Sequence, residues 1–179
     1  MHERRFHADI KSLRSPERMA LMEVEKVVEL CLEGIQAQNA LDVGTGSGIF
    51  AEAFAARGLV VAGIDANPEM VKTAKGYVPQ GKFKLAPAEA VPYPDKSFDL
   101  VFLGHVLHET DDALKALQEA HRLARQRVAV FEWPYLDEEF GPPLAHRLKP
   151  ETIGDLARQA GFQEFEAVPL EHMAFYRLK

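Results

Sequence analysis

Three glycines stand close to two acidic residues in the first half of the sequence. Gly44, Gly46 and Gly48 alternate with other small residues in the stretch LDVGTGSGIF, Asp42 precedes the first glycine by two positions, and Asp65 ends the next apolar run. A glycine-rich turn after the first strand of an α/β sheet lets the backbone approach a ligand closely. A carboxylate beside such a turn attracts a cationic group or accepts hydrogen bonds from sugar hydroxyls. The pattern therefore predicts a site for a nucleotide-like ligand.

The spacing of the glycines distinguishes between such ligands. A dinucleotide fingerprint has the order G-x-G-x-x-G, which would place its third glycine where Ile49 stands. Asp42 would also repel a pyrophosphate, whereas it suits the ammonium group of S-adenosylmethionine, a ligand without phosphate. The sequence thus favours S-adenosylmethionine as the cofactor, with Asp65 at its ribose. Asp65 could also cap the helix that begins NPEM.

A second group of polar residues follows two later apolar runs. His105 and His108 stand in GHVLHE, while Glu132 and Trp133 end RVAVFEW. The carboxyl ends of parallel strands meet at the ligand crevice, so we expect these side chains near the methyl donor. His105 is the first candidate for a general base and Glu132 the second. Packing or capping is the favoured role of His108, His105 could simply form a cavity wall, and Trp133 could lie in the substrate pocket or in the core.

Short apolar runs alternate with helical patterns, and these elements must position the candidate residues. The expected strands are NALDVG, LVVAGID, FKLAPA, FDLVFLG, RVAVFEW, FQEFEAVPL and HMAFYRL, and the expected helices cover about residues 15–34, 49–57, 68–77, 111–125 and 149–161. Apolar strands in strict alternation with helices predict an α/β fold with a doubly wound, mostly parallel sheet. The last two strands are so close in sequence that they must be antiparallel. Residues 134–148 form the least regular segment.

Length and composition limit the class of protein. The 179 residues suffice for one core, which predicts a single domain over residues 1–179. A net charge of −6 argues against a general nucleic-acid-binding surface. No apolar run approaches the roughly 20 residues of a membrane helix, and the single cysteine, Cys31, excludes internal disulfides and multi-cysteine metal sites. Since the N-terminus has no secretory signal pattern, we expect a soluble, cytoplasmic protein without membrane insertion.

Four stretches follow one another in an order that is typical of one enzyme family. They are LDVGTGSG, GIDANPEMVKTAK, AEAVPYPDKSFDLVFLGHVLHE and LKPETIGDLARQAGF. Together they resemble the first motif, the second strand and helix, the approach to the fourth strand and the last helix of class I S-adenosylmethionine-dependent methyltransferases. The resemblance is to the type 11 group, related to ubiquinone and menaquinone biosynthesis, and covers about residues 39–179. It implies a Rossmann-like, seven-stranded sheet with a C-terminal antiparallel hairpin and helices on both faces.

The resemblance also implies a role for individual residues around the cofactor. It places Asp42 at the amino end, Gly44, Gly46 and Gly48 along the methionine and ribose parts, Asp65 at the ribose, Ala66, Ala88 and Glu89 around the adenine, and Gly104 and His105 beside the methionine tail and the transferable methyl. Pro87 departs from the family pattern, which usually has an Asp at this position. The adenine contact of that carboxylate is therefore expected from Glu89 or from another group.

The leading hypothesis is an enzyme that transfers a methyl group from S-adenosylmethionine to a small-molecule acceptor by in-line displacement. The acceptor brings the nucleophile, so the protein would act mainly by positioning. A non-catalytic protein that binds S-adenosylmethionine or S-adenosylhomocysteine and acts through a partner is the alternative. A nicotinamide-dependent dehydrogenase is opposed by the glycine spacing and by Asp42. The sequence indicates neither the acceptor nor the oligomeric state.

Residues 1–34 are predicted to form a helical lid segment, and residues 35–179 the cofactor-binding and substrate core. The charged leader HERRFHADIKSLR has no place in the sheet, and the corresponding segment of the resembled family often lies over the cofactor. Deleting residues 1–14 should therefore weaken cofactor binding several-fold, as measured by calorimetry. An unchanged affinity would refute the lid.

Overall fold

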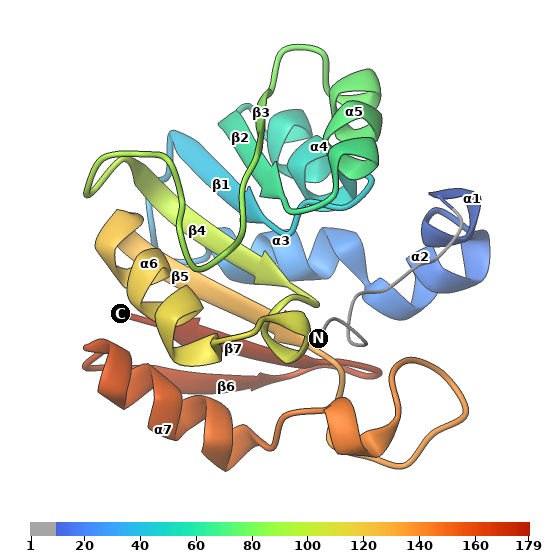
Figure 1. The fold of residues 1–179 in the computed structure, drawn as a ribbon, viewed down its shortest axis with the longest axis vertical. Helices are drawn as coiled ribbons and strands as arrows, with labels where there is room; N and C mark the ends of the chain where they lie inside the picture. Colours follow the sequence, from blue (N-terminus) through green and yellow to red (C-terminus); the bar gives the residue numbers. More distant parts are fainter. Residues whose placement is uncertain (1–9) are drawn as a thin grey trace.

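A seven-stranded sheet forms the centre of the molecule (Figure 1). The computed structural model describes residues 10–179. The strands are β1 Asn39–Val43, β2 Val60–Asp65, β3 Lys82–Leu85, β4 Phe98–Gly104, β5 Ala124–Glu132, β6 Phe165–Pro169 and β7 Ala174–Leu178. Their order across the sheet is β3-β2-β1-β4-β5-β7-β6, which confirms the predicted doubly wound arrangement.

Strands β1 to β5 are parallel, and β7 is the strand that breaks this pattern. β1 pairs with β2 on one side and with β4 on the other, whereas β7 pairs antiparallel with both β5 and β6. The predicted C-terminal hairpin is therefore confirmed. Strand order reverses between β1 and β4, so the connections after these two strands leave in opposite directions and open a crevice at their carboxyl ends.

Helices cover both faces of the sheet, as predicted. They are α1 Ile10–Leu13, α2 Pro16–Met22, α3 Val24–Leu32, α4 Ile49–Ala56, α5 Pro68–Tyr77, α6 Ala113–Leu123 and α7 Pro150–Ala160, with short 3₁₀ turns η1 Leu107–Glu109 and η2 Leu144–His146. The core on one face is shared with α3, α4 and α5, and the core on the other with α6 and α7 (Figure 1). Within residues 10–179, no helix has the length and apolar character needed to cross a membrane.

The N-terminal helical region differs from its prediction. We expected one helix over residues 15–34, but the chain bends at Glu23, which adopts a left-handed conformation (φ 44°, ψ 44°) between α2 and α3. The predicted start is correct, because the Ser15 side chain accepts a hydrogen bond from the Arg18 amide. The Glu23 carboxylate accepts hydrogen bonds from Lys26 Nζ and from the Glu171 amide, and these contacts offset the cost of its backbone conformation. The bend lets α2 leave the line of α3 (Figure 1).

The helix predicted over residues 111–125 is shorter at both ends. It begins after Asp112, whose side chain accepts a hydrogen bond from the Lys115 amide and caps the first turn. It ends at Leu123 because β5 begins at Ala124. The irregular segment expected after β5 is confirmed as a loop that contains only η2.

Substitution of Phe102 on β4 would test the packing of the core. Its ring is fully buried and lies 4.5 Å from that of Phe50, 5.6 Å from that of Phe54 and 6.3 Å from that of Phe131, measured between centroids. Phe102→Ala should lower the free energy of unfolding by about 3–5 kcal/mol, because it leaves a cavity under α4. Urea unfolding measures this loss.

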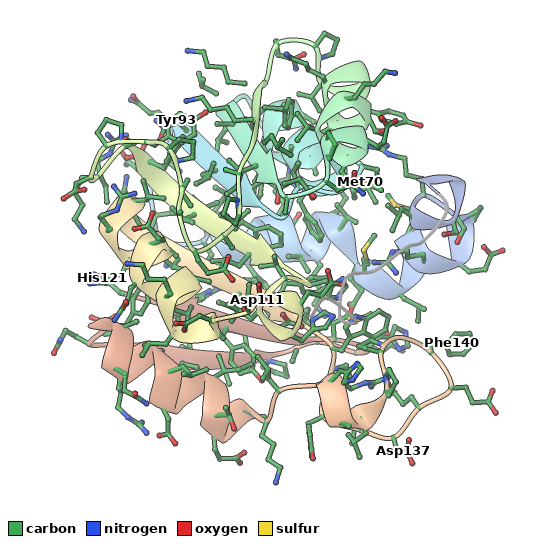
Figure 2. All side chains as sticks on the ribbon, viewed as in Figure 1. Met70, Tyr93, Asp111, His121, Asp137 and Phe140 are labelled. Carbon is green, nitrogen blue, oxygen red and sulfur yellow. The ribbon has the colours of Figure 1, made fainter. Side chains whose placement is uncertain are left out.

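Phe140 provides the matched control, since it lies 67% exposed on the outer loop after β5 (Figure 2). Phe140→Ala should change the free energy of unfolding by less than about 0.5 kcal/mol. Equal losses for the two variants would contradict the assignment of Phe102 to the core.

Candidate functional site

A cavity of about 820 Å³ opens at the carboxyl ends of the central strands. This volume lies within the usual range of small-molecule and cofactor sites. Every site residue predicted from the sequence lies in its wall except Gly48 and Glu132, the second candidate for a general base. The structure thus brings together residues from the turns after β1, β2, β3 and β4, as the crevice rule predicts.

The turn between β1 and α4 contains the three glycines. Gly44 has a φ of 65°, and a Cβ atom at this position would come within 2.6 Å of Val106 Cγ2 in the turn after β4. Gly48 has a φ of 80° and packs against α5, where a Cβ atom would lie 3.0 Å from the Ala74 Cα atom. Gly44 therefore allows the two turns to meet, while Gly48 allows helix α4 to pack on α5 and does not face the cavity.

Asp42 is a buried carboxylate at the base of this turn. Asp42 is only 3% exposed. Its Oδ2 accepts hydrogen bonds from Thr45 Oγ1 at 2.8 Å and from the Ala51 amide at 3.2 Å. Burial raises its pKa to about 7, although both hydrogen bonds oppose the shift, and the charge of Asp65 adds to it. Near neutral pH the site can therefore gain a negative charge, which a cationic ligand group would stabilise.

Asp65 ties the end of β2 to the glycine turn. Its Oδ2 accepts a hydrogen bond from the Gly46 amide at 2.9 Å, and its Oδ1 accepts one from the Asn67 amide at 2.8 Å. The cap of α5 is Asn67, whose side chain accepts a hydrogen bond from the Glu69 amide. Helix capping by Asp65, the alternative considered from the sequence, is thus wrong. The carboxylate lies in the cavity wall together with Ala66.

The turn after β3 forms the opposite edge of the cavity. Ala88 is buried there, and the exposed Pro87 lies beside it. Glu89 reaches across the opening, where its Oε1 accepts hydrogen bonds from the amides of Asp111 at 3.0 Å and Asp112 at 3.3 Å. Glu89 therefore also holds the start of α6, a contact that the sequence did not indicate.

His105 follows β4 in a left-handed conformation with a φ of 54°. Its amide donates to the Phe131 carbonyl at 2.7 Å, and its ring lies between those of Phe131 and Trp133, at centroid distances of 4.6 Å and 4.9 Å. Burial, aided by the charges of Arg18 and His108, lowers the pKa of His105 well below its usual value. The imidazole is therefore neutral at neutral pH. Its Nε2 is buried, with no hydrogen-bond partner in the described part of the chain.

His108 and Glu132 form a buried pair beside the cavity. His108 Nδ1 lies 2.7 Å from Glu132 Oε2, and Glu132 Oε1 accepts a hydrogen bond from the Leu107 amide at 2.9 Å. Burial lowers the pKa of His108, but the hydrogen bond to Glu132 and the charges of Glu132 and Glu109 have the larger combined effect. The pKa of His108 is therefore raised above its usual value. Both oxygens of Glu132 are engaged, so Glu132 acts as the partner of His108, and His108 lines the cavity.

Two arginines that the sequence left without a role shape the remaining walls. Arg147 is buried under the loop after β5, where its side chain donates to the carbonyls of Pro134 and Pro142 and to Glu138 Oε2. Arg18 on α2 lines the cavity. Periodicity gave no signal for either residue, because arginine is usually exposed.

The N-terminal segment contributes Leu13, Arg18 and Met22 to the cavity wall. Arg14 fixes this segment to the glycine turn, because its Nη2 donates to the Ser47 carbonyl at 2.9 Å. Part of the predicted lid, residues 1–9, lies outside the described residues.

Comparison with known proteins identifies the family. A family model described as a methyltransferase domain matches residues 41–131, about half of the chain. The chain belongs to the class I S-adenosylmethionine-dependent methyltransferases of type 11. The resemblance inferred from the four sequence motifs is thereby confirmed.

Individual relatives of this chain carry different names. The chain is 35% identical over 95 residues to a demethylmenaquinone methyltransferase of Chlorobaculum tepidum, an alignment that covers 52% of this chain and 39% of the relative. It is 31% identical over 142 residues to a malonyl-[acyl-carrier protein] O-methyltransferase of Halorhodospira halophila, covering 73% and 45%. The chain thus spans less than half the length of these two relatives.

A solved structure matches nearly the whole chain. It is the crystal structure of a SAM-dependent methyltransferase from Aquifex aeolicus, with a TM-score of 0.81 and 25% sequence identity. The match covers 94% of this chain and 95% of that one. The seven-stranded arrangement is therefore that of a known methyltransferase.

The buried Asp42 predicts a pH-dependent stability difference. A pKa raised from 3.8 to about 7 means that the folded state favours the protonated form of Asp42. The resulting contribution to the free energy of unfolding is complete below about pH 4 and is lost as the pH rises through about 7. Relative to the parent chain, Asp42→Asn should gain on the order of 2 kcal/mol in unfolding free energy between about pH 5 and about pH 8. Urea unfolding at both pH values measures this gain.

Asp137→Asn, at an exposed position on the loop after β5 (Figure 2), is the control and should show no such gain. A difference between Asp42→Asn and the parent chain that is constant with pH would contradict the raised pKa.

Proposed function

We propose that this protein transfers a methyl group from S-adenosylmethionine to a small-molecule acceptor. One observation carries the proposal: Asp42 and Asp65 lie around one glycine turn and face one cavity at the point where strand order reverses. Family membership supports the same donor. No contact among the described residues favours the alternative, a non-catalytic protein that binds the donor and acts through a partner.

The donor fits the acidic half of this cavity. Asp42 would hold the ammonium, and the backbone of Gly44 and Gly46 would follow the methionine and ribose parts. Asp65 would accept hydrogen bonds from the ribose hydroxyls, because each of its oxygens keeps acceptor capacity beyond the one amide that it binds. Gly104 would flank the methionine tail. We assign Gly48 a packing role, since it faces α5.

The adenine would lie between the turns after β2 and β3. Ala66 and Ala88 offer apolar surfaces to a flat ring. We assign Glu89 to the adenine edge. Pro87 stands where the family usually has an Asp, and its side chain cannot form a hydrogen bond. Glu89 Oε1 already accepts two amides, so Glu89 Oε2 is the oxygen that we assign to the ligand.

The bound donor supplies a methyl group on a positively charged sulfur, which a nucleophile of the acceptor displaces in line. The contribution of the chain is to hold the two reactants at near-attack distance with water excluded, an effect that reaches about 7–11 kcal/mol in well-oriented models. We propose that residues 1–34 act as a lid in this step, since Leu13, Arg18 and Met22 form part of the cavity wall.

His105 is the residue that we place against the acceptor. Its neutral imidazole can accept a proton or a hydrogen bond through Nε2 if the acceptor is a phenol or an activated carbon. The depressed pKa of His105 makes it a weak base, whereas Glu132 makes His108 a stronger one. A proton taken from the acceptor would therefore be held best by the His108–Glu132 pair, with His105 forming the adjoining wall.

We place the acceptor between α2 and the loop after β5, which both contribute residues to the cavity wall. Relatives named for demethylmenaquinone and for malonyl-[acyl-carrier protein] differ in acceptor while sharing this domain. We therefore assign acceptor choice to these walls rather than to the glycine turn. A net charge of −6 disfavours nucleic acid as the substrate.

Asp65→Asn tests the donor site. The substitution removes the charge that would hold two ribose hydroxyls, and a hydrogen bond to a charged group contributes about 1.5–3 kcal/mol. We expect calorimetry to show S-adenosylhomocysteine binding weakened by about 10-fold or more. Asp137→Asn is the control and should bind with the parent affinity. Equal affinities for Asp65→Asn and the parent chain would contradict the proposed ribose contact.

Turnover separates the enzyme from a non-catalytic binder. The parent chain is incubated with S-adenosylmethionine and a panel of phenols, acids, amines and thiols, and S-adenosylhomocysteine release is followed together with the mass gain of one methyl group on the acceptor. Donor binding without turnover on any acceptor would favour the non-catalytic alternative.

A further inference from the structure

The loop after β5 is built around one buried arginine. The side chain of Arg147 is fully buried, and its guanidinium donates to the carbonyls of Pro134 at 3.0 Å and of Pro142 at 2.9 Å. It also donates to the carbonyl of Phe140 and, at 2.9 Å, to Glu138 Oε2. Three backbone carbonyls and one carboxylate of the same loop therefore share one guanidinium, whose planar fork of N–H donors suits several acceptors at once.

The same loop supplies one wall of the cavity. Its lining residues are Gly141, Pro142, Pro143 and His146. Gly141 has a φ of 84°, and a Cβ atom at this position would come within 2.7 Å of Cδ2 in the Trp133 indole. The glycine therefore lets the loop backbone lie directly against Trp133, which also lines the cavity. Arg147 itself lies behind this wall and does not line the cavity.

The polarity of the wall follows from the hydrogen bonds within the loop. Pro142 and Pro143 have no N–H group, so their backbone offers a ligand no donor. The Pro142 carbonyl is bonded to Arg147, and the Pro143 carbonyl accepts a hydrogen bond from the His146 amide at 2.8 Å. Both carbonyls are thus engaged inside the loop. These two residues present chiefly their apolar rings to a ligand.

The residues around this wall offer little to a charged ligand group. Met22, Phe50 and Trp133 line the same cavity and belong to one buried apolar cluster. Arg18 and Glu109 also line it, but their charges are opposite and interact: burial lowers the pKa of Arg18, and the charge of Glu109 opposes this shift. An acceptor that brought a charge against the loop would therefore lose hydration without gaining a partner from the loop.

We propose that Arg147 is a positioning residue that determines acceptor specificity, because it keeps the loop wall apolar. It acts without touching the acceptor, by holding the loop carbonyls and Glu138 away from the cavity. The proposal rests on the proposed function and adds the class of acceptor, a molecule whose end against the loop is uncharged and apolar. Without Arg147, the same loop would offer three carbonyls and a carboxylate, which attract a cation.

Three phenols that differ in the charge of one end test the proposal. 4-Propylphenol ends in a methyl group, tyramine in an ammonium and 4-hydroxyphenylacetate in a carboxylate, and all three have the phenol hydroxyl. Calorimetry on the full chain, saturated with S-adenosylhomocysteine, gives the affinity for each. The parent chain should bind 4-propylphenol about 10-fold or more tightly than either charged phenol, because a buried charge without a partner is costly.

The variants are Arg147→Met, Arg147→Lys and the control Arg158→Gln on α7, whose side chain is 68% exposed. In Arg147→Met the loop carbonyls and Glu138 lose their donor, so the preference for 4-propylphenol over tyramine should fall by about 10-fold. 4-Hydroxyphenylacetate should gain nothing, because the freed groups are all acceptors. Arg147→Lys should keep part of the preference, since an ammonium replaces the charge but not the fork. Arg158→Gln should keep the parent preference.

The affinity for S-adenosylhomocysteine should be the same in the parent chain and in all variants, because the proposed donor contacts lie on other turns. The ratio of affinities for two phenols within one variant is also insensitive to partial unfolding. If Arg147→Met does not fold, Arg147→Lys decides, with a reduced preference supporting the proposal and an unchanged one contradicting it.

Two further results would overturn the proposal. One is a parent chain that binds S-adenosylhomocysteine but binds the three phenols equally or not at all. The other is a folded Arg147→Met that retains the parent preference for 4-propylphenol. A parent chain that does not bind S-adenosylhomocysteine would instead overturn the proposed function, so the two failures are distinguishable.

Discussion

Two carboxylates hold the glycine turn at the reversal point of the sheet. Asp42 accepts hydrogen bonds from the Thr45 hydroxyl and the Ala51 amide. Asp65, at the end of the neighbouring strand β2, accepts one from the Gly46 amide. The turn is thus fixed from both β1 and β2, with its backbone facing the cavity. Because acidic groups supply this support, the cavity they build is suited to a cationic ligand and unsuited to a pyrophosphate. The proposed choice of donor thus rests on the same contacts that shape the turn.

The other half of the cavity depends on the neighbouring strands β4 and β5. Their parallel pairing brings the turn that contains His105 and His108 beside Glu132. One imidazole is kept neutral by burial and the other gains a carboxylate partner, so two histidines three positions apart have opposite pKa shifts. Such a divergence suits the two roles that we propose for them, one as a wall and hydrogen-bond acceptor and the other as a base.

Much of the fold was predictable because the central strands β1, β2 and β4 are buried on both faces and read as apolar runs. The donor half of the site was predictable for a related reason, since strand ends in a parallel sheet converge. The break at Glu23 was not, because the apolar spacing of Ala20, Val24 and Val27 continues a helical pattern across it and a left-handed Glu has no sequence signal. The role of Gly48 was likewise inaccessible, because spacing does not reveal whether a glycine faces a ligand or a helix.

The acceptor half was predicted least well. The pairing of His108 with Glu132 depends on the register of β4 against β5, and the burial of Arg147 depends on a loop without periodicity. Arg18 reached the cavity only because α2 turns away at Glu23. These features arise from tertiary contacts between residues far apart in sequence, which local patterns do not encode.

In the proposed function, Asp42 and Asp65 select a cationic, phosphate-free donor. The most direct measurement is a pair of calorimetric titrations of the parent chain, one with S-adenosylmethionine and one with NADH. We expect one molecule of S-adenosylmethionine to bind per chain, with no response to NADH. Binding of NADH without any response to S-adenosylmethionine would contradict the proposed function.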